Sequence, residues 1–244
     1  MVTNLAYFYE ASRKIRGGKW VWVKDGNGEQ RGNVLLGGTI LNPKNGFDHL
    51  YAAQLVQYTP GSGCLIFRSF KVHTATAAST DTTIYVEGDG YSDAPEVGMV
   101  VMKAPESVVV ETLTADTTSG AVTKTAEDYT GQSAKITAVT YDKANGKFAI
   151  TLDNALGELT TNDILVEATG TAKSASAKVL VPNPNTFIEA DRDLLPTEGY
   201  GIEGDANYSI STVYNKQAWI ARMQPLPKYV LAKNRSYIDG IFWI

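Results

Sequence analysis

The chain has 244 residues, a formal net charge of −4 and a hydrophobic content of 43%. These values are ordinary for a globular protein with a real core, and they allow one large or two small domains. The single cysteine excludes an intramolecular disulfide, and two histidines with scattered acidic residues provide no evident metal site or nucleophile–base pair. We therefore predict a protein without catalytic residues, metal or cofactor. A glycosidase-type pair of carboxylates is the enzymatic arrangement that the sequence leaves open.

No targeting or membrane signal is visible in the sequence. Residues 1–12 lack the basic region and the apolar core of a signal peptide. A run of about 18 apolar residues, which a membrane-spanning helix needs, does not occur. We therefore expect no membrane partner.

Charge is distributed unevenly along the chain. Residues 81–128 hold ten acidic and two basic residues, residues 1–31 hold three acidic and six basic ones, and residues 213–238 hold five basic residues and no acidic one. This asymmetry indicates that the central part faces solvent and that the two ends face a partner. The basic residues form no stripe and belong to no nucleic-acid-binding motif, so we expect no specific nucleic-acid partner.

The N-terminal part, residues 1–62, is predicted to be an arm that carries a hairpin. Residues 19–24 alternate as a strand, and residues 33–41 form the return strand. Trp20 and Trp22 lie on one face of the first strand, and a lone hairpin cannot bury both rings. Two interpretations follow, a core shared with the rest of the chain and a contact with another chain.

Residues 63–182 are predicted to form a small β-barrel or sandwich. One strand–loop–strand pattern occurs twice, at residues 83–101 and 149–166, and the second strand of each copy begins at glycine or at Asn-Asp. Residues 114–131, rich in Thr, Ala, Ser and Asp, are predicted to be an exposed loop or ribbon. Further strands are predicted at residues 65–72, 108–110, 135–141 and 178–181. Short strands at this spacing are typical of a closed barrel, and a pair of immunoglobulin-like sheets is the alternative.

The C-terminal part, residues 183–244, is predicted to be a linker followed by a β-rich arm. Strands are expected at residues 208–213 and 218–223, and the chain ends in four large apolar residues, 241–244. Because chain ends are normally polar and frayed, this run either pairs as a strand within the same chain or inserts between subunits.

The two arms are each too small to fold alone. We therefore predict that they form one second β-rich layer together and that residues 63–182 are inserted between them as a projecting module. The predicted fold class is mainly β.

The two strand–loop–strand units and the C-terminal run at residues 208–227 resemble the head-fibre and capsid-decoration proteins of tailed bacteriophages. The resemblance extends over residues 60–244. It implies a non-enzymatic virion protein that is assembled in the cytoplasm of the host bacterium. Such a protein binds the major capsid protein on the capsid exterior, as a homodimer or homotrimer.

In that arrangement the two apolar arms make the contact. Large aromatic side chains dominate many protein interfaces. The expected interface residues are therefore the large apolar residues of the arms: Trp20, Trp22, Phe242, Trp243 and Ile244.

An alternative function is a carbohydrate- or receptor-binding module. Tyrosines near acidic loops can stack on sugars, and residues 81–181 contain Tyr85, Tyr91, Tyr129 and Tyr141. A host-surface glycan is the partner expected in this case. The two hypotheses overlap if the projecting module contacts the host surface.

Overall fold

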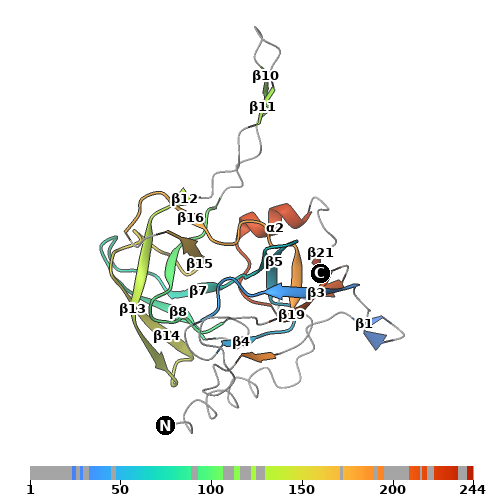
Figure 1. The fold of residues 1–244 in the computed structure, drawn as a ribbon. Coiled ribbons are helices and arrows are strands. Elements are labelled where there is room, and N and C mark those ends of the chain that lie inside the picture. Colours follow the sequence, from blue (N-terminus) through green and yellow to red (C-terminus); the bar gives the residue numbers. More distant parts are fainter. Residues whose placement is uncertain are drawn as a thin grey trace.

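The computed structural model describes part of the chain, namely residues 24–25, 28–29, 33–44, 48–88, 93–106, 113–115, 122–124, 130–170, 173–188, 192–194, 209–214, 216–218, 223–235 and 241–243. The described part is mainly β, as predicted. It consists of a barrel and a second sheet packed beside it (Figure 1).

Six antiparallel strands close the barrel. In ring order they are β7 (Ser69–Thr74), β8 (Thr83–Glu87), β14 (Lys147–Leu152), β13 (Ser133–Asp142), β9 (Val100–Lys103) and β15 (Ile164–Thr169), and β15 pairs again with β7. Every strand of the ring therefore has a neighbour on both sides, and none offers a free edge. The closed ring decides between the two predicted architectures in favour of the barrel.

The two predicted copies of the strand–loop–strand unit pair with each other. β8 pairs with β14, with Ile84 opposite Ile150, and β9 pairs with β15, with Met102 opposite Val166. Antiparallel pairing of equivalent strands gives the barrel an approximate two-fold symmetry.

The predicted start of the second strand was wrong in both copies. It begins at Val100 and not at Val97 in the first copy, and at Ile164 and not at Asn162 in the second. In the first copy the reason is local, because Gly98 has a φ of +100°, which a strand residue does not adopt.

The barrel core follows from the alternation of side chains along the strands. On β14 the buried residues are Phe148, Ile150 and Leu152, at period two. They pack with apolar residues of the other barrel strands and with Leu156 and Leu159 of the loop between β14 and β15.

The two ends of the chain build the second sheet, as predicted. Its strand order is β3 (Asn33–Thr39), β19 (Ser209–Tyr214), β17 (Thr186–Ile188), β5 (Leu55–Thr59) and β6 (Gly63–Ile66). A bridge between Ile40 and Cys64 links the end of β3 to β6, and the Leu41 amide donates to the Cys64 carbonyl at 2.8 Å. We call these five strands the arm sheet.

A single predicted strand at residues 65–72 proves to be two. It divides at Phe67 and Arg68, so that β6 belongs to the arm sheet and β7 to the barrel. This division is where the chain passes from one layer to the other.

The remaining elements are short. The hairpin β10 (Leu113–Ala115) and β11 (Val122–Lys124) lies far from the barrel body, at the top of Figure 1, in the region predicted as an exposed loop or ribbon. The predicted strand at 108–110 lies outside the described residues. The other paired strands are β1 (Lys24–Asp25) with β2 (Gly28–Glu29), β4 (Asp48–Leu50) with β18 (Arg192–Leu194), β12 (Thr130–Gly131) with β16 (Ala177–Val179), and β20 (Lys216–Ala218) with β21 (Ile241–Trp243).

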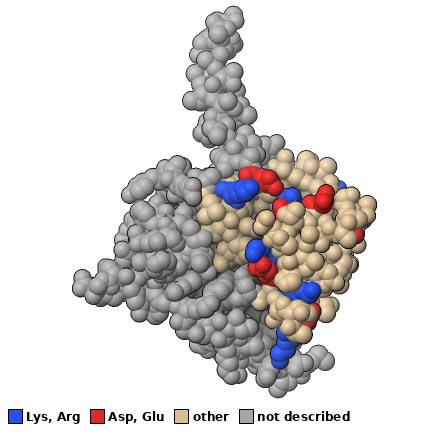
Figure 2. Space-filling view, turned by 180° about the vertical axis from the view of Figure 1, so that it is seen from behind, with Lys and Arg blue, Asp and Glu red and all other residues tan. Residues whose placement is uncertain are grey.

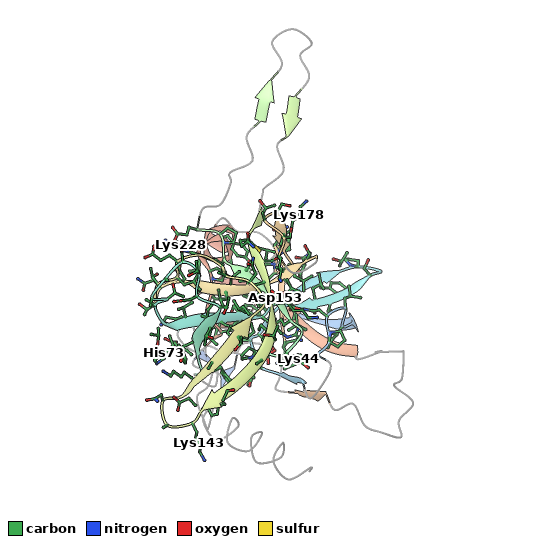
Figure 3. All side chains as sticks on the ribbon, turned by 90° about the vertical axis from the view of Figure 1, so that its left-hand side faces the viewer. Lys44, His73, Lys143, Asp153, Lys178 and Lys228 are labelled. Carbon is green, nitrogen blue, oxygen red and sulfur yellow. The ribbon has the colours of Figure 1, made fainter. Side chains whose placement is uncertain are left out.

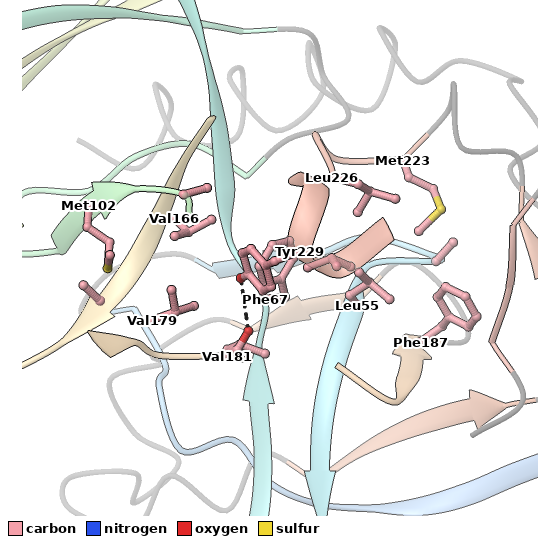
Figure 4. Packing of buried hydrophobic residues seen from close by; sticks show 14 of the residues in the cluster. Leu55, Phe67, Met102, Val166, Val179, Val181, Phe187, Met223, Leu226 and Tyr229 are labelled. Atoms are coloured by element: carbon pink, nitrogen blue, oxygen red, sulfur yellow. Dashed lines mark hydrogen bonds between the residues drawn. The ribbon is translucent and has the colours of Figure 1, made fainter. Parts of the chain in front are cut away.

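The barrel and the arm sheet share an apolar core (Figure 4). On β9 and β15, Val101 and Leu165 face the barrel interior, whereas Met102 and Val166 face this shared core. Leu55 and Phe187 of the arm sheet belong to the same core, and burying each large side chain contributes about 1.5–3 kcal/mol. Barrel and arm sheet are therefore packed as one body.

Helix α2 (Lys228–Arg235) closes the shared core and was not predicted from the sequence. Tyr229 and Val230 are fully buried in it, and the Tyr229 hydroxyl donates to the Val181 carbonyl at 3.3 Å. The helix begins after Pro227, whose carbonyl accepts from the Val230 and Leu231 amides. Pro227 thus stands immediately before the first helical residue, where its missing N–H costs no helical hydrogen bond.

Candidate functional site

The predicted interface residues are only partly within the described chain. Phe242 and Trp243 lie in β21, whose backbone pairs in parallel with β20, opposite Gln217 and Ala218. The apolar terminus thus pairs as a strand within its own chain, which was one of the two interpretations. Trp20, Trp22 and Ile244 lie outside the described residues, and the role of all five residues as an interface remains a prediction.

The tyrosines of the glycan alternative do not form one platform. Tyr85 is opposite Ala149 and Tyr141 is opposite Phe148, and these two partners are consecutive on β14, so the tyrosines lie on opposite faces of the sheet. The Tyr141 ring packs on Phe148 with centroids 4.7 Å apart, and the Lys147 Nζ lies 4.4 Å from the centroid of the Tyr85 ring. Tyr91 and Tyr129 lie outside the described residues.

The most distinctive polar feature of the described chain is a buried charged cluster between the barrel and the arm sheet. Its members come from four separate segments. They are Asn42 and Lys44 after β3, Arg68 between β6 and β7, Asp93 in the loop between β8 and β9, and Glu167 on β15. We call these five residues the junction cluster.

Arg68 is the centre of the junction cluster and is 1% exposed. Its Nε donates to Asp93 Oδ2 at 2.9 Å, and its Nη1 donates to the Asn42 carbonyl at 2.7 Å and to Glu167 Oε2 at 3.3 Å. The guanidinium therefore ties the barrel loop and β15 to the segment that follows β3.

Lys44 and Asn42 complete the network. The Lys44 Nζ donates to Asp93 Oδ1 and, at 2.7 Å, to the Ala94 carbonyl. The Asn42 side chain donates to the Ile66 carbonyl at 2.9 Å and to Glu167 Oε2 at 3.0 Å, and it accepts from the Ile66 amide at 2.8 Å. Asn42 thus bonds both to β6 of the arm sheet and to β15 of the barrel.

The two carboxylates of the junction cluster are shifted in opposite directions. Burial alone would raise the pKa of Asp93, but Lys44 and Arg68 outweigh it and hold that pKa below its ordinary value of 3.8. Burial raises the pKa of Glu167 above its ordinary value of 4.5, because the opposing effects of Arg68 and Asn42 are smaller. Charged groups this deeply buried are tolerated only when each keeps its partners.

Sequence reasoning missed the junction cluster. The available signal was one charged residue inside each of two apolar runs, Arg68 in residues 65–70 and Glu167 in residues 164–168. A charge in a predicted core strand implies a buried partner. It does not indicate which of the 26 acidic residues the partner is.

Other classes of site find no support in the described chain. None of its helices is long and apolar enough to span a bilayer, and among the described residues no three or more His, Cys, Asp or Glu side chains are grouped so that they could hold a metal ion. On the face seen in Figure 2, acidic and basic side chains lie in small mixed groups and not in a stripe of one sign.

Comparison of the chain with protein-family models, with curated proteins and with solved structures finds no match.

Proposed function

We propose that this protein is a non-enzymatic structural component of a virion, attached to the exterior of a tailed-phage capsid as a head fibre or decoration protein. The observation that carries the proposal is the two-layer architecture. A sheet built from both ends of the chain holds a closed barrel that is inserted between them. In this arrangement the arm sheet can bind the capsid while the barrel projects from it.

The junction between the two layers suits display. The shared apolar core and the junction cluster fix the barrel to the arm sheet through packing and buried hydrogen bonds. A rigid junction keeps the displayed module at one orientation on every copy.

The closed barrel also suits display in many copies. Unpaired strand edges on neighbouring copies would pair with one another and aggregate, and a ring without edges avoids this. Repetition over a capsid makes weak single contacts effective. The basic character of residues 1–31 and 213–238 and the acidic character of residues 81–128 favour attachment through the arms.

Co-expression with the major capsid protein of the same genome tests the proposal. We expect the protein to sediment with assembled shells and to saturate at a fixed ratio to the capsid protein. Recovery only at the top of the gradient, with shells present, would contradict the proposal.

Two variants locate the contact. Replacing Trp20 and Trp22 by serine should release the protein from shells. Lys143→Glu changes the turn of the β13–β14 hairpin, at the end of the barrel opposite the β10–β11 ribbon (Figure 3), and should leave sedimentation unchanged. A glycan array with the full chain tests the carbohydrate alternative separately.

A further inference from the structure

A cavity of about 420 Å³ opens beside the junction cluster. Its walls come from the segment after β3, the end of the β8–β9 loop with the start of β9, and the end of β15. This volume lies within the range of about 300–1,000 Å³ that is typical of ligand sites.

The cavity wall contains two cations and two carboxylates, and both cations are engaged by a neighbouring carboxylate. Lys44 and Arg68 lie in its wall, but both direct donors to Asp93, which is not a wall residue. Glu167 also lies in the wall, and its hydrogen bonds from Asn42 and Arg68 both reach Oε2. Among the described residues no donor is placed against Glu167 Oε1.

Glu96 adds a second carboxylate to the same wall. Among the described residues its side chain has no hydrogen-bond or ion-pair partner. Counted with Asp93, the cavity and the junction cluster contain two cations, Lys44 and Arg68, against three carboxylates. An incoming cation is therefore favoured over an anion.

The cavity wall contains one exposed large apolar residue. Within the described chain, Val97 and Leu41 are the large hydrophobic residues that remain exposed, at 51% and 49%. Val97 lies in the wall, and Leu41 precedes the wall residue Asn42. Wall carboxylates beside an exposed valine fit a cationic head on an aliphatic stem.

Two residues of the cavity wall are glycines with positive φ angles. Gly98 and Gly170 have φ angles of +100° and +96°, which favour glycine. A Cβ atom built on either would meet no atom of the described residues within 4 Å. Their amides are therefore suitable reporters of a bound group.

We propose that this cavity binds a lysine or arginine side chain of a partner protein. Glu96 and Glu167 receive the cationic head, and Val97 contacts the aliphatic stem. The carboxylates of Glu96 and Glu167 and the exposed Val97 support this occupant over an inorganic anion, because the two wall cations already bind Asp93. The inference goes beyond the capsid proposal and does not depend on it.

Nuclear magnetic resonance on the full-length, ¹⁵N-labelled chain tests this assignment. The probes are the acetylated amides of lysine and arginine, with the acetylated amide of norleucine as the uncharged control of similar shape. We expect saturable shifts of the Gly98 and Gly170 amides with the two cationic probes, and binding of norleucine weaker by about fivefold or more.

A matched pair of variants separates the cavity from the general charge of the surface. Glu96→Gln should weaken lysine binding by about fivefold. Glu158→Gln removes an exposed carboxylate from the loop between β14 and β15, outside the cavity, and should leave binding unchanged. Unchanged spectra elsewhere in each variant show that the fold is kept.

Three results would overturn the assignment. They are the absence of saturable shifts at Gly98 and Gly170, equal binding of norleucine, and shifts with inorganic phosphate but not with the lysine probe. Binding of cadaverine in place of both amino-acid probes would also overturn it, because the site would then serve a free diamine. The Gly98 and Gly170 amides could also shift without any probe as the protein concentration rises. That result would support the assignment and would identify the partner as a second copy of the chain.

Discussion

At the scale of single residues, the junction cluster shows how a buried charge can hold two layers together. A complete buried ion network contributes little more than well-packed apolar residues would, but an incomplete one is strongly destabilising. Arg68 meets Asp93 across 25 residues of sequence and Glu167 across 99. Such separations explain why the sequence alone did not identify the partners of Arg68.

Asp93→Asn should destabilise the protein by about 3–5 kcal/mol, because Lys44 and Arg68 would then remain buried without their shared carboxylate. Urea unfolding followed by circular dichroism measures this loss.

The matched control is Glu87→Gln. Glu87 pairs with Lys71 at 2.8 Å, but the two side chains are 30% and 42% exposed, so the expected cost is about 0–1 kcal/mol. Equal costs for the two variants would show that the junction cluster is no more important than a surface ion pair.

The opposite pKa shifts of the two carboxylates predict a pH dependence. The lowered pKa of Asp93 gives stability that is present above 3.8 and is lost as the pH falls through the folded-state pKa. The raised pKa of Glu167 acts the other way, so its contribution is complete below 4.5 and is lost as the pH rises through the folded-state pKa.

Glu167→Gln removes the second effect. The free energy of unfolding of the variant should therefore improve relative to the wild type as the pH rises above 4.5. Urea unfolding of both proteins at a series of pH values measures the difference. A difference that is independent of pH would contradict the raised pKa.

At the scale of elements, local sequence patterns predicted most of the barrel strands. The features that they did not predict depend on partners far away in the sequence. Alternation gave β8, β13 and β14, because each has one buried and one exposed face. The division of the 65–72 run was not predictable, because both halves are apolar and only their different sheet partners separate them. Helix α2 was missed because two of its first three residues, Tyr229 and Val230, favour strands in isolation.

Close backbone approach between elements makes a further prediction. A Cβ on Gly88 would lie 2.9 Å from the Gly146 carbonyl oxygen and 3.0 Å from Tyr141 Cε2, where β8 meets the β13–β14 turn. Gly88→Ala should therefore cost about 1–3 kcal/mol, measured by thermal or urea unfolding.

Gly131→Ala is the comparison for this position. Its Cβ would meet only the terminal methyl group of Met102, which is the flexible end of a side chain. We expect a smaller cost than for Gly88→Ala, and the reverse order would show that the turn adjusts more easily than the core.

At the scale of the whole molecule, the sequence predicted the layers better than the site. The mainly β class, a barrel in the central part and a sheet from both arms follow from strand periodicity and from the small size of each arm. The junction cluster and the cavity beside it depend on contacts of Arg68 with Asn42, Asp93 and Glu167, which no local pattern contains.

The predicted interface at the C-terminus has a direct consequence for assembly. If Phe242, Trp243 and Ile244 join subunits, the full chain is a dimer or trimer, and a chain that ends at Ser236 is a monomer. Light scattering gives both masses, and circular dichroism checks that the shortened chain keeps its β structure. If both chains are monomers, the terminal residues do not join subunits, and β21 only pairs with β20 of the same chain.

Cryo-electron microscopy of shells co-assembled with this protein tests the central claim most directly. We predict added density outside the shell, with the arm sheet nearest the capsid surface and the barrel farther out. Shells without added density, or a barrel seated on the shell with the arm sheet outermost, would contradict the account.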